Sequence, residues 1–118
     1  MEKLHNTETF NNFAAGRRII TYGGYFEAFM DTLTEDEQQK VNYGLLLLKT
    51  GSRLSTRFVK HIEDGLYELR TKYENRCLRT FFIFDKGNVV VLFGGFRKKV
   101  QKTPRREIEK AKQIMCVH

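Results

Sequence analysis

Residues 77–96 read CLRTFFIFDKGNVVVLFGGF, and this stretch decides the fold. Two runs rich in aromatic and β-branched residues flank the polar turn Asp85–Asn88, whose glycine suits a positive φ. The stretch therefore predicts a β-hairpin with strands over 77–84 and 88–96. Side chains alternate between the two faces of a strand, so Arg79 is expected to share one face with apolar residues. The pair Gly94–Gly95 predicts a bulge or a sharp bend in the second strand.

The neighbouring sequence adds strands to this hairpin. Residues 66–70 follow Gly65 and form another apolar-rich run, while residues 17–22 (RRIITY) form a β-branched run that Gly23–Gly24 ends. Residues 52–64 are a basic connection without a clear period. We therefore expect a small, mainly antiparallel sheet.

Two helices are expected between the first strand and the basic connection. Apolar residues at i, i+3, i+4 and i+7 from Phe26 give residues 26–33 one apolar face. A capping box formed by Thr34 and Glu37 begins a second helix, which Gly51 ends. The two helices form an α-hairpin, and we expect its outer face to carry the acidic residues Asp31, Glu35, Asp36 and Glu37.

A third helix is expected at the C-terminus. Thr103 is predicted as its N-cap and Pro104 as its first residue, with Ile108, Ala111 and Met115 facing the core. The elements together predict an α+β fold, in which a helical hairpin packs on a small antiparallel β-sheet with a C-terminal helix.

Length and composition predict one folded domain. A chain of 118 residues with 41% hydrophobic residues and one proline can form one core and is too apolar for a disordered segment. Residues 1–16 are polar and aperiodic, so we expect a loose N-terminal arm before a domain over 17–118. The longest apolar run, residues 45–48, is far too short for a membrane span, and no signal-peptide core is found. We expect a soluble, cytoplasmic protein without a membrane partner.

Positive charge is concentrated in the second half of the chain. Residues 1–48 carry a net charge of −3, whereas residues 49–118 carry +10. An excess of this size favours a polyanionic partner, most simply a nucleic acid, over a neutral metabolite. The alternative is that solvated Lys and Arg side chains serve solubility only.

The densest part of this charge lies between the last strand and the last helix. Six basic residues and no acidic one fall within ten positions: Arg97, Lys98, Lys99, Lys102, Arg105 and Arg106. Such a run is either a solvated turn or a phosphate-binding surface. Adjacent strands should bring Arg70 and Arg79 near it. Arg70 has the alternative of pairing with Glu68, and Arg79 suits either a forked phosphate contact or a buried ion pair.

Motifs for a metal or a nucleotide cofactor are not found in the sequence. Cys77 and Cys116 have neither a CxxC partner nor a metal-ligand spacing, so we expect reduced thiols. His5, His61 and His118 are not spaced as helical metal ligands, and no glycine-rich phosphate loop occurs. We therefore expect no metal and no small-molecule cofactor.

Three stretches of the second half, GLYELR (65–70), NRCLRTFFIF (75–84) and VVVLFGGFRKKVQKTPRREIEKA (89–111), resemble the RelE/ParE toxin superfamily, specifically its phage-derived, HigB-like branch. The resemblance is strong over residues 60–112, and the α-hairpin at 24–50 agrees with the family's pattern. It implies a RelE-like fold and a type II toxin–antitoxin system, with a cognate antitoxin encoded alongside. For the ribonuclease members it also implies metal-free cleavage of mRNA in the ribosomal A site.

The resemblance implies roles for individual residues. Arg79 matches the strand arginine that acts on the scissile phosphate, and Lys98 and Lys99 match a basic position at the end of the following strand. Arg70 matches the last residue of the preceding strand and is expected to contact RNA or the ribosome. Further expected RNA or ribosome contacts are Arg97, Lys102, Arg105, Arg106, Lys60 and His61.

The general acid or base is the least defined part of the resemblance. Relatives often place Tyr or His at or after the C-terminal helix, and here only His118 stands there, with Lys60 and His61 as alternatives. The expected reaction is attack of the ribose 2′-OH on the adjacent phosphorus, which needs no nucleophile from the protein. The alternatives are a ParE-like protein that inhibits DNA gyrase by binding, or a degenerate phage protein that only binds nucleic acid.

Overall fold

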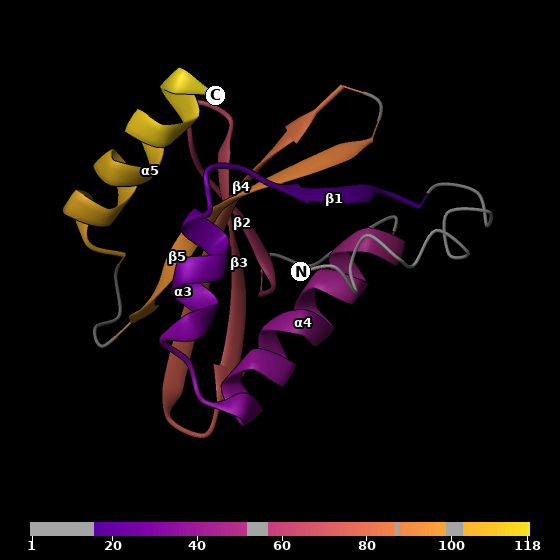
Figure 1. The fold of residues 1–118 in the computed structure, drawn as a ribbon, viewed down its shortest axis with the longest axis vertical. Coiled ribbons are helices and arrows are strands. Elements are labelled where there is room, and N and C mark those ends of the chain that lie inside the picture. The colour runs from indigo at the N-terminus through magenta and orange to yellow at the C-terminus, as the bar shows by residue number, and fades with distance from the viewer. Residues whose placement is uncertain (1–15, 52–56, 87, 99–102) are drawn as a thin grey trace.

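The computed structural model describes residues 16–51, 57–86, 88–98 and 103–118. Within these ranges the chain forms a five-stranded sheet with helices on both faces (Figure 1). The elements in chain order are β1 (Arg18–Thr21), α3 (Tyr25–Asp31), α4 (Glu35–Thr50), β2 (Val59–Glu63), β3 (Leu66–Tyr73), β4 (Arg76–Asp85), β5 (Val89–Lys98) and α5 (Arg105–Val117). The predicted α+β class is confirmed. The predicted arm, residues 1–16, lies outside the described residues except for Gly16.

The sheet has the strand order β1-β5-β4-β3-β2. The pairs among β2, β3, β4 and β5 are antiparallel, as predicted, whereas β1 lies parallel to β5. Sequence analysis missed β2 within the basic connection. This strand has only five residues, lies at the sheet edge and is half-exposed, so its sequence (VKHIE) lacks the apolar alternation of an inner strand.

Each face of the sheet has its own core. Leu78 and Phe82 of β4 pack with Phe26 of α3 and Leu45 of α4 on one face. The alternate residues of β4, including Phe81, pack on the other face under α5. The predicted alternation along β4 is therefore confirmed, and Figure 1 shows α5 on the opposite side of the sheet from the α3–α4 hairpin. None of the helices in the described ranges is both long and apolar enough to cross a membrane.

The predicted bulge lies at Gly94. The register of β4 and β5 shifts between Phe81 and Phe82, where β5 contains an additional residue, and Gly94 has a φ of 112°. At Gly95, a Cβ would lie 2.1 Å from the carbonyl oxygen of Arg79. A side chain would therefore push β5 away from β4 beside Arg79, which explains the second glycine. In the hairpin turn, Asn88 has a positive φ of 62°, while Gly87 is outside the described residues.

The start of α5 differs from the prediction. Pro104 is the N-cap rather than the first helical residue, and it makes no side-chain cap hydrogen bond. The Thr103 hydroxyl instead donates to Oε2 of Glu68 at 2.9 Å. The predicted N-cap was wrong because the buried carboxylate takes the hydroxyl that would otherwise cap the helix.

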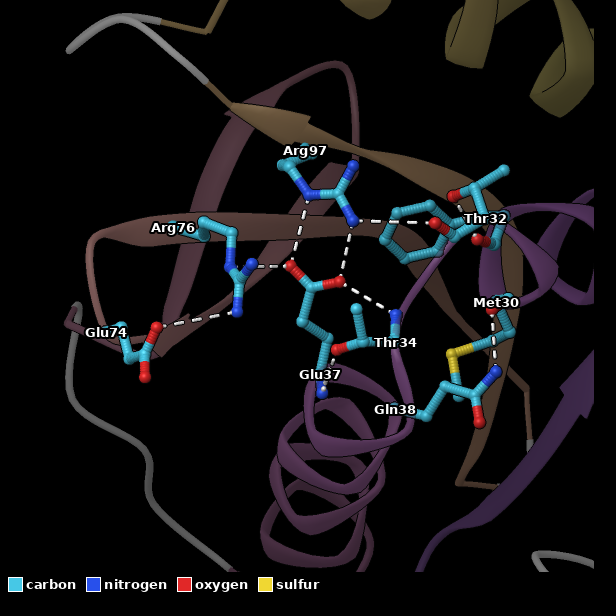
Figure 2. A network of polar contacts seen from close by, with 9 residues as sticks. Met30, Thr32, Thr34, Glu37, Gln38, Glu74, Arg76 and Arg97 are labelled. Carbon is cyan, nitrogen blue, oxygen red and sulfur yellow. Dashed lines mark hydrogen bonds and ion pairs between the residues drawn. The ribbon is translucent and has the colours of Figure 1, made fainter.

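Glu37 is also placed differently from the prediction. The capping box with Thr34 is confirmed, but Glu37 is fully buried instead of lying on the outer face of the hairpin. Its carboxylate accepts two hydrogen bonds from Arg97, at 2.6 and 3.1 Å, and Nε of Arg76 lies 3.0 Å away (Figure 2). Two arginines from distant strands compensate the burial of the Glu37 carboxylate. The helical period does not reveal such partners, so it predicted that Glu37 would lie on the outer face.

This network predicts a specific dependence of stability on pH. Hydrogen bonds from Arg97 lower the pKa of Glu37 from 4.5 to about 2. Because the folded-state pKa lies below the unfolded value, the stabilisation is fully present above about pH 5 and is lost as the pH falls towards 2. We expect Glu37→Gln to lower the free energy of unfolding at neutral pH by roughly 3 kcal/mol.

Thermal or urea unfolding across this pH range measures the effect. The difference between the wild type and Glu37→Gln should shrink as the pH falls, whereas Glu35→Gln, at an exposed residue of the same helical turn, should have little effect. A difference that stays constant down to about pH 2 would contradict the assigned role of Glu37.

Candidate nucleic-acid interface

The sheet brings together three of the predicted cations. Arg70 of β3 and Arg79 of β4 are directly opposite each other in the ladder, and Lys98 of β5 is opposite Cys77, two positions from Arg79. The alternation of side chains therefore places all three on the face that α5 covers. We call Arg70, Arg79 and Lys98 the cationic cluster.

A single buried carboxylate holds two members of this cluster. Glu68 is fully buried, and its Oε1 lies 3.1 Å from Nε of Arg70 and 3.5 Å from Nε of Arg79. Its other oxygen accepts the hydrogen bond from Thr103. The alternative predicted for Arg70, pairing with Glu68, is confirmed. One carboxylate beside three cations leaves an excess of two positive charges in the cluster.

Arg79 is buried without complete hydrogen bonding. Its residue is 8% exposed, its Nη1 donates to the carbonyl of Leu78 at 3.2 Å, and its Nε has no hydrogen-bond partner. Burial lowers the pKa of Arg79, the charge of Glu68 opposes this change, and the charge of Arg70 adds to it. The guanidinium therefore retains donor capacity for an additional acceptor.

Lys98 is buried in the same cationic surroundings. It is 7% exposed, and its ammonium makes no hydrogen bond or ion pair with any described residue. Burial lowers the pKa of Lys98, and the positive charge of Arg79 lowers it further. The Nζ atom is not among the fully buried unpaired atoms of the described residues, so an anion bound at the cluster could contact it and offset its repulsion with Arg79.

The other cations of the predicted basic run do not join this cluster. Arg97 points to the opposite face of the sheet, where it binds Glu37. Both terminal nitrogens of Arg105 donate to Glu63 at 2.7 Å, and Arg105 also pairs with Glu109. Arg106 is exposed. Lys99 and Lys102 lie outside the described residues.

Of the candidate proton-transfer residues, Lys60 is a cross-strand neighbour of Glu68, whereas His118 packs elsewhere. His118 packs against Tyr22 and Phe93, with ring centroids 5.1 and 5.6 Å apart. His118 follows the last residue of α5, whereas Thr103, which donates to Glu68, precedes the first. Lys60 is exposed and opposite Glu68 in the β2–β3 ladder, while His61 packs on Tyr67 at 5.0 Å. The structure does not bring His118 to Arg79.

Sequence analysis missed a groove that continues from the cluster. The groove has a volume of about 840 Å³, and it is lined by parts of α4, β3 and β4 and by residues 57–58. Its lining contains five cations and, among the described residues, no acid: Lys40, Arg57, Arg70, Lys72 and Arg79. Two aromatic rings, Tyr43 and Phe58, lie in the same lining. We call this surface the basic groove.

The basic groove was not predictable as a unit because its parts are far apart in sequence. Lys40 and Tyr43 belong to a helix that the sequence indicated to be acidic, and Arg57 and Phe58 precede a strand that was not predicted. Neither ring stands out in the sequence, because Tyr43 lies two positions before the apolar run 45–48 and Phe58 lies within the basic connection. The described residues contain no group of three or more His, Cys, Asp or Glu side chains placed to hold a metal ion.

The burial of Lys98 predicts opposite effects of one substitution on stability and on anion binding. Because the Lys98 side chain is largely buried beside the charge of Arg79, Lys98→Met should raise the free energy of unfolding by about 1 kcal/mol. The same change should remove most of the increase in melting temperature that inorganic phosphate gives the wild type. Lys86→Met, at an exposed turn residue, is the matched control. An unchanged response to phosphate in Lys98→Met would contradict an anion site at Lys98.

Comparisons with known proteins give a similar solved structure and a family match. A chain of the archaeal RelE–RelB complex from Pyrococcus horikoshii is similar to this structure with a TM-score of 0.47 and 10% identity, covering 69% of this chain and 93% of that one. A search of curated sequences finds no match. Residues 28–116 match the family described as phage derived protein Gp49-like (DUF891). Since this match covers most of the chain, the chain belongs to the Gp49-like family of phage-derived proteins.

Proposed function

We propose that this protein is the toxin of a type II toxin–antitoxin system and acts as a ribosome-dependent mRNA endoribonuclease that needs no metal. The observation that carries the proposal is the cationic cluster, in which Arg79 has a buried Nε without a hydrogen bond and Lys98 is a largely buried residue beside it. The sequence resemblance to RelE-type ribonucleases at the same residues supports it. A site made only of cations suits a reaction in which the RNA supplies its own nucleophile.

The proposed reaction proceeds by attack of a ribose 2′-oxygen on the adjacent phosphorus. The new P–O bond forms as the bond to the 5′-oxygen of the next nucleotide breaks, which leaves a 2′,3′-cyclic phosphate and a 5′-hydroxyl. Arg79 would donate hydrogen bonds to the non-bridging oxygens, where negative charge develops in the transition state. Lys98, on the same face of the sheet, would become a second positive charge as it takes up the proton of the 2′-hydroxyl.

Proton transfer from the nucleophile is assigned to Lys98 in this proposal: its neutral amine would accept the proton of the 2′-hydroxyl, and water would protonate the departing 5′-oxygen. Burial and the charge of Arg79 lower the pKa of Lys98, which brings its neutral form closer to physiological pH. The ribosome would supply the orientation of the mRNA, a contribution that is large when two reacting groups are held in line. Arg70, held by Glu68, would contact the RNA backbone beside the reacting phosphate.

The main alternative is a protein that acts by binding alone, as a ParE-like inhibitor of DNA gyrase or as a degenerate nucleic-acid-binding phage protein. Two observations favour it: Arg79 already pairs with Glu68, and His118 lies away from the cluster. In either case we propose a cognate antitoxin as partner, because an acidic segment could cover the excess charge of the second half.

Expression in bacteria tests the proposed activity. The wild type should stop growth and produce new 5′-hydroxyl ends in mRNA, with matching fragments that carry a 2′,3′-cyclic phosphate. Arg79→Lys keeps the charge beside Glu68 but loses the guanidinium fork, so it should reduce cleavage by at least about 100-fold while remaining folded. Co-expression of the adjacent small open reading frame should restore growth.

Several outcomes would separate the candidates. Fragments that end in a plain 3′-hydroxyl would contradict attack by the 2′-oxygen, and new DNA ends without RNA cleavage would support gyrase inhibition. Harmless expression of folded protein would contradict the toxin assignment. Circular dichroism of each variant shows whether lost activity reflects lost folding, which matters for Arg79→Ala because that change leaves Glu68 buried with one arginine fewer.

The position of His118 leads to a separate prediction. A positioned acid or base contributes about 10²- to 10⁴-fold to a rate. Because the His118 ring packs on Tyr22 and Phe93 rather than near Arg79, its deletion should reduce cleavage by less than about tenfold. The measurement is the single-turnover rate on programmed ribosomes. A loss of 100-fold or more, with the fold intact, would return the acid–base role to His118.

A further inference from the structure

The basic groove combines positive charge with exposed aromatic rings. We infer that it binds a single strand of RNA, with Tyr43 and Phe58 stacking on unpaired bases while the lining cations contact the phosphates. The inference rests on the proposed function, because it names the path by which RNA would reach the cationic cluster. It assigns binding roles to residues outside the cluster that sequence analysis did not select: Lys40, Tyr43, Arg57, Phe58 and Lys72.

The charge of the groove points to a polyanion. Its five lining cations come from four parts of the chain, namely α4, the residue at 57, β3 and β4, and no described lining residue is acidic. Lys40 and Lys72 are exposed and make no hydrogen bond or ion pair with described residues. They can therefore contact phosphates without first breaking an ion pair, unlike Arg105, which Glu63 already holds.

The two rings have the exposure expected of stacking surfaces. Tyr43 is 60% exposed and Phe58 is 42% exposed, and neither belongs to the two cores of the sheet. Exposed aromatic rings within a cationic groove are the pattern by which proteins bind single-stranded nucleic acids, because every base offers a face for stacking. Duplex RNA cannot use such rings, since its bases are already stacked in the helix.

The helix that carries Tyr43 is held close to the sheet. A Cβ at Gly44 would lie 2.7 Å from the side chain of Thr71, so the glycine allows α4 to approach β3 at this point. Thr71 lies between Arg70 and Lys72, which also line the groove. This contact fixes the Tyr43 side of the groove relative to the strand that carries two of its cations.

The groove and the cluster share two residues. Arg70 and Arg79 line the groove and are also the members of the cluster that Glu68 holds. A strand bound along the groove would therefore present a backbone phosphate to Arg79. An acidic protein segment could contact the same cations, but it would gain no base stacking from Tyr43 and Phe58, which is why the two ligands can be distinguished.

Fluorescence anisotropy with a labelled, unstructured 2′-O-methyl oligonucleotide tests the inference on the full chain without ribosomes. This probe lacks the 2′-hydroxyl, so the result does not depend on cleavage. Tyr43→Ala and Phe58→Ala should each weaken binding by about 5-fold or more at every salt concentration, because stacking contributes roughly that much per base. Tyr43→Phe should retain most of the affinity, and a hairpin duplex should bind more weakly than the single strand.

The lysines should respond in a different way. Lys40→Ala and Lys72→Ala should each reduce the slope of log K against log salt by about 0.7, the value for one phosphate contact on a single strand, whereas the aromatic variants should leave it unchanged. Phe84→Ala and Lys86→Ala are matched controls outside the groove, since Phe84 is 41% exposed and Lys86 is also exposed. Photocrosslinking of an oligonucleotide that contains 5-iodouridine should label peptides with Tyr43 or Phe58.

The outcomes separate this inference from the proposed activity. If Arg79→Lys abolishes RNA cleavage but the oligonucleotide still crosslinks to peptides with Tyr43 or Phe58, the assignment of the groove stands. Normal cleavage on ribosomes with no effect of Tyr43→Ala and Phe58→Ala on oligonucleotide binding would overturn the groove and leave the proposed function standing. Binding of an acidic peptide that equals RNA binding and is insensitive to both aromatic variants would assign the groove to a protein partner instead.

Discussion

The buried carboxylate of Glu68 is the interaction on which the candidate site depends. Arg70 and Arg79 are opposite each other on adjacent strands, where two like charges would destabilise the ladder. Glu68 lies between them and also accepts the hydroxyl of Thr103, so one side chain joins β3, β4 and the segment before α5. The buried Glu68 carboxylate orients these cations and offsets their mutual repulsion. Several positive charges can therefore lie close together on β3 and β4 while the two strands stay paired.

This arrangement also changes how the two hypotheses for Arg79 relate to each other. A buried ion pair and a phosphate contact are usually treated as exclusive uses of one arginine. Here the ion pair is long, at 3.5 Å, and Nε is left without a hydrogen bond, so the pairing positions the guanidinium without saturating it. By contrast, Arg97 donates two hydrogen bonds to the buried carboxylate of Glu37, so its role is to stabilise the fold.

Local patterns predicted the fold well, and they predicted the site only where it lies on one hairpin. The alternation along residues 77–84 correctly separated Arg79 from Leu78, and the two glycines correctly indicated the bulge. The errors came from partners that are distant in sequence: Arg97 draws Glu37 into the interior, and Glu68 takes the Thr103 hydroxyl from the helix cap. The basic groove was missed for the same reason, because α4 and β3 meet only in the folded chain.

The parallel pairing of β1 with β5 has a consequence for synthesis of the protein. Arg18 is next to Val89 in the sheet, so the first described strand cannot find its place until the last strand has been made. Contacts between such remote segments form late in folding. Lys98 and Thr103 follow still later in the chain, and a nascent polypeptide therefore lacks a complete cationic cluster until most of the domain has left the ribosome. The residues of the cluster therefore come together only when the last part of the chain has been synthesised.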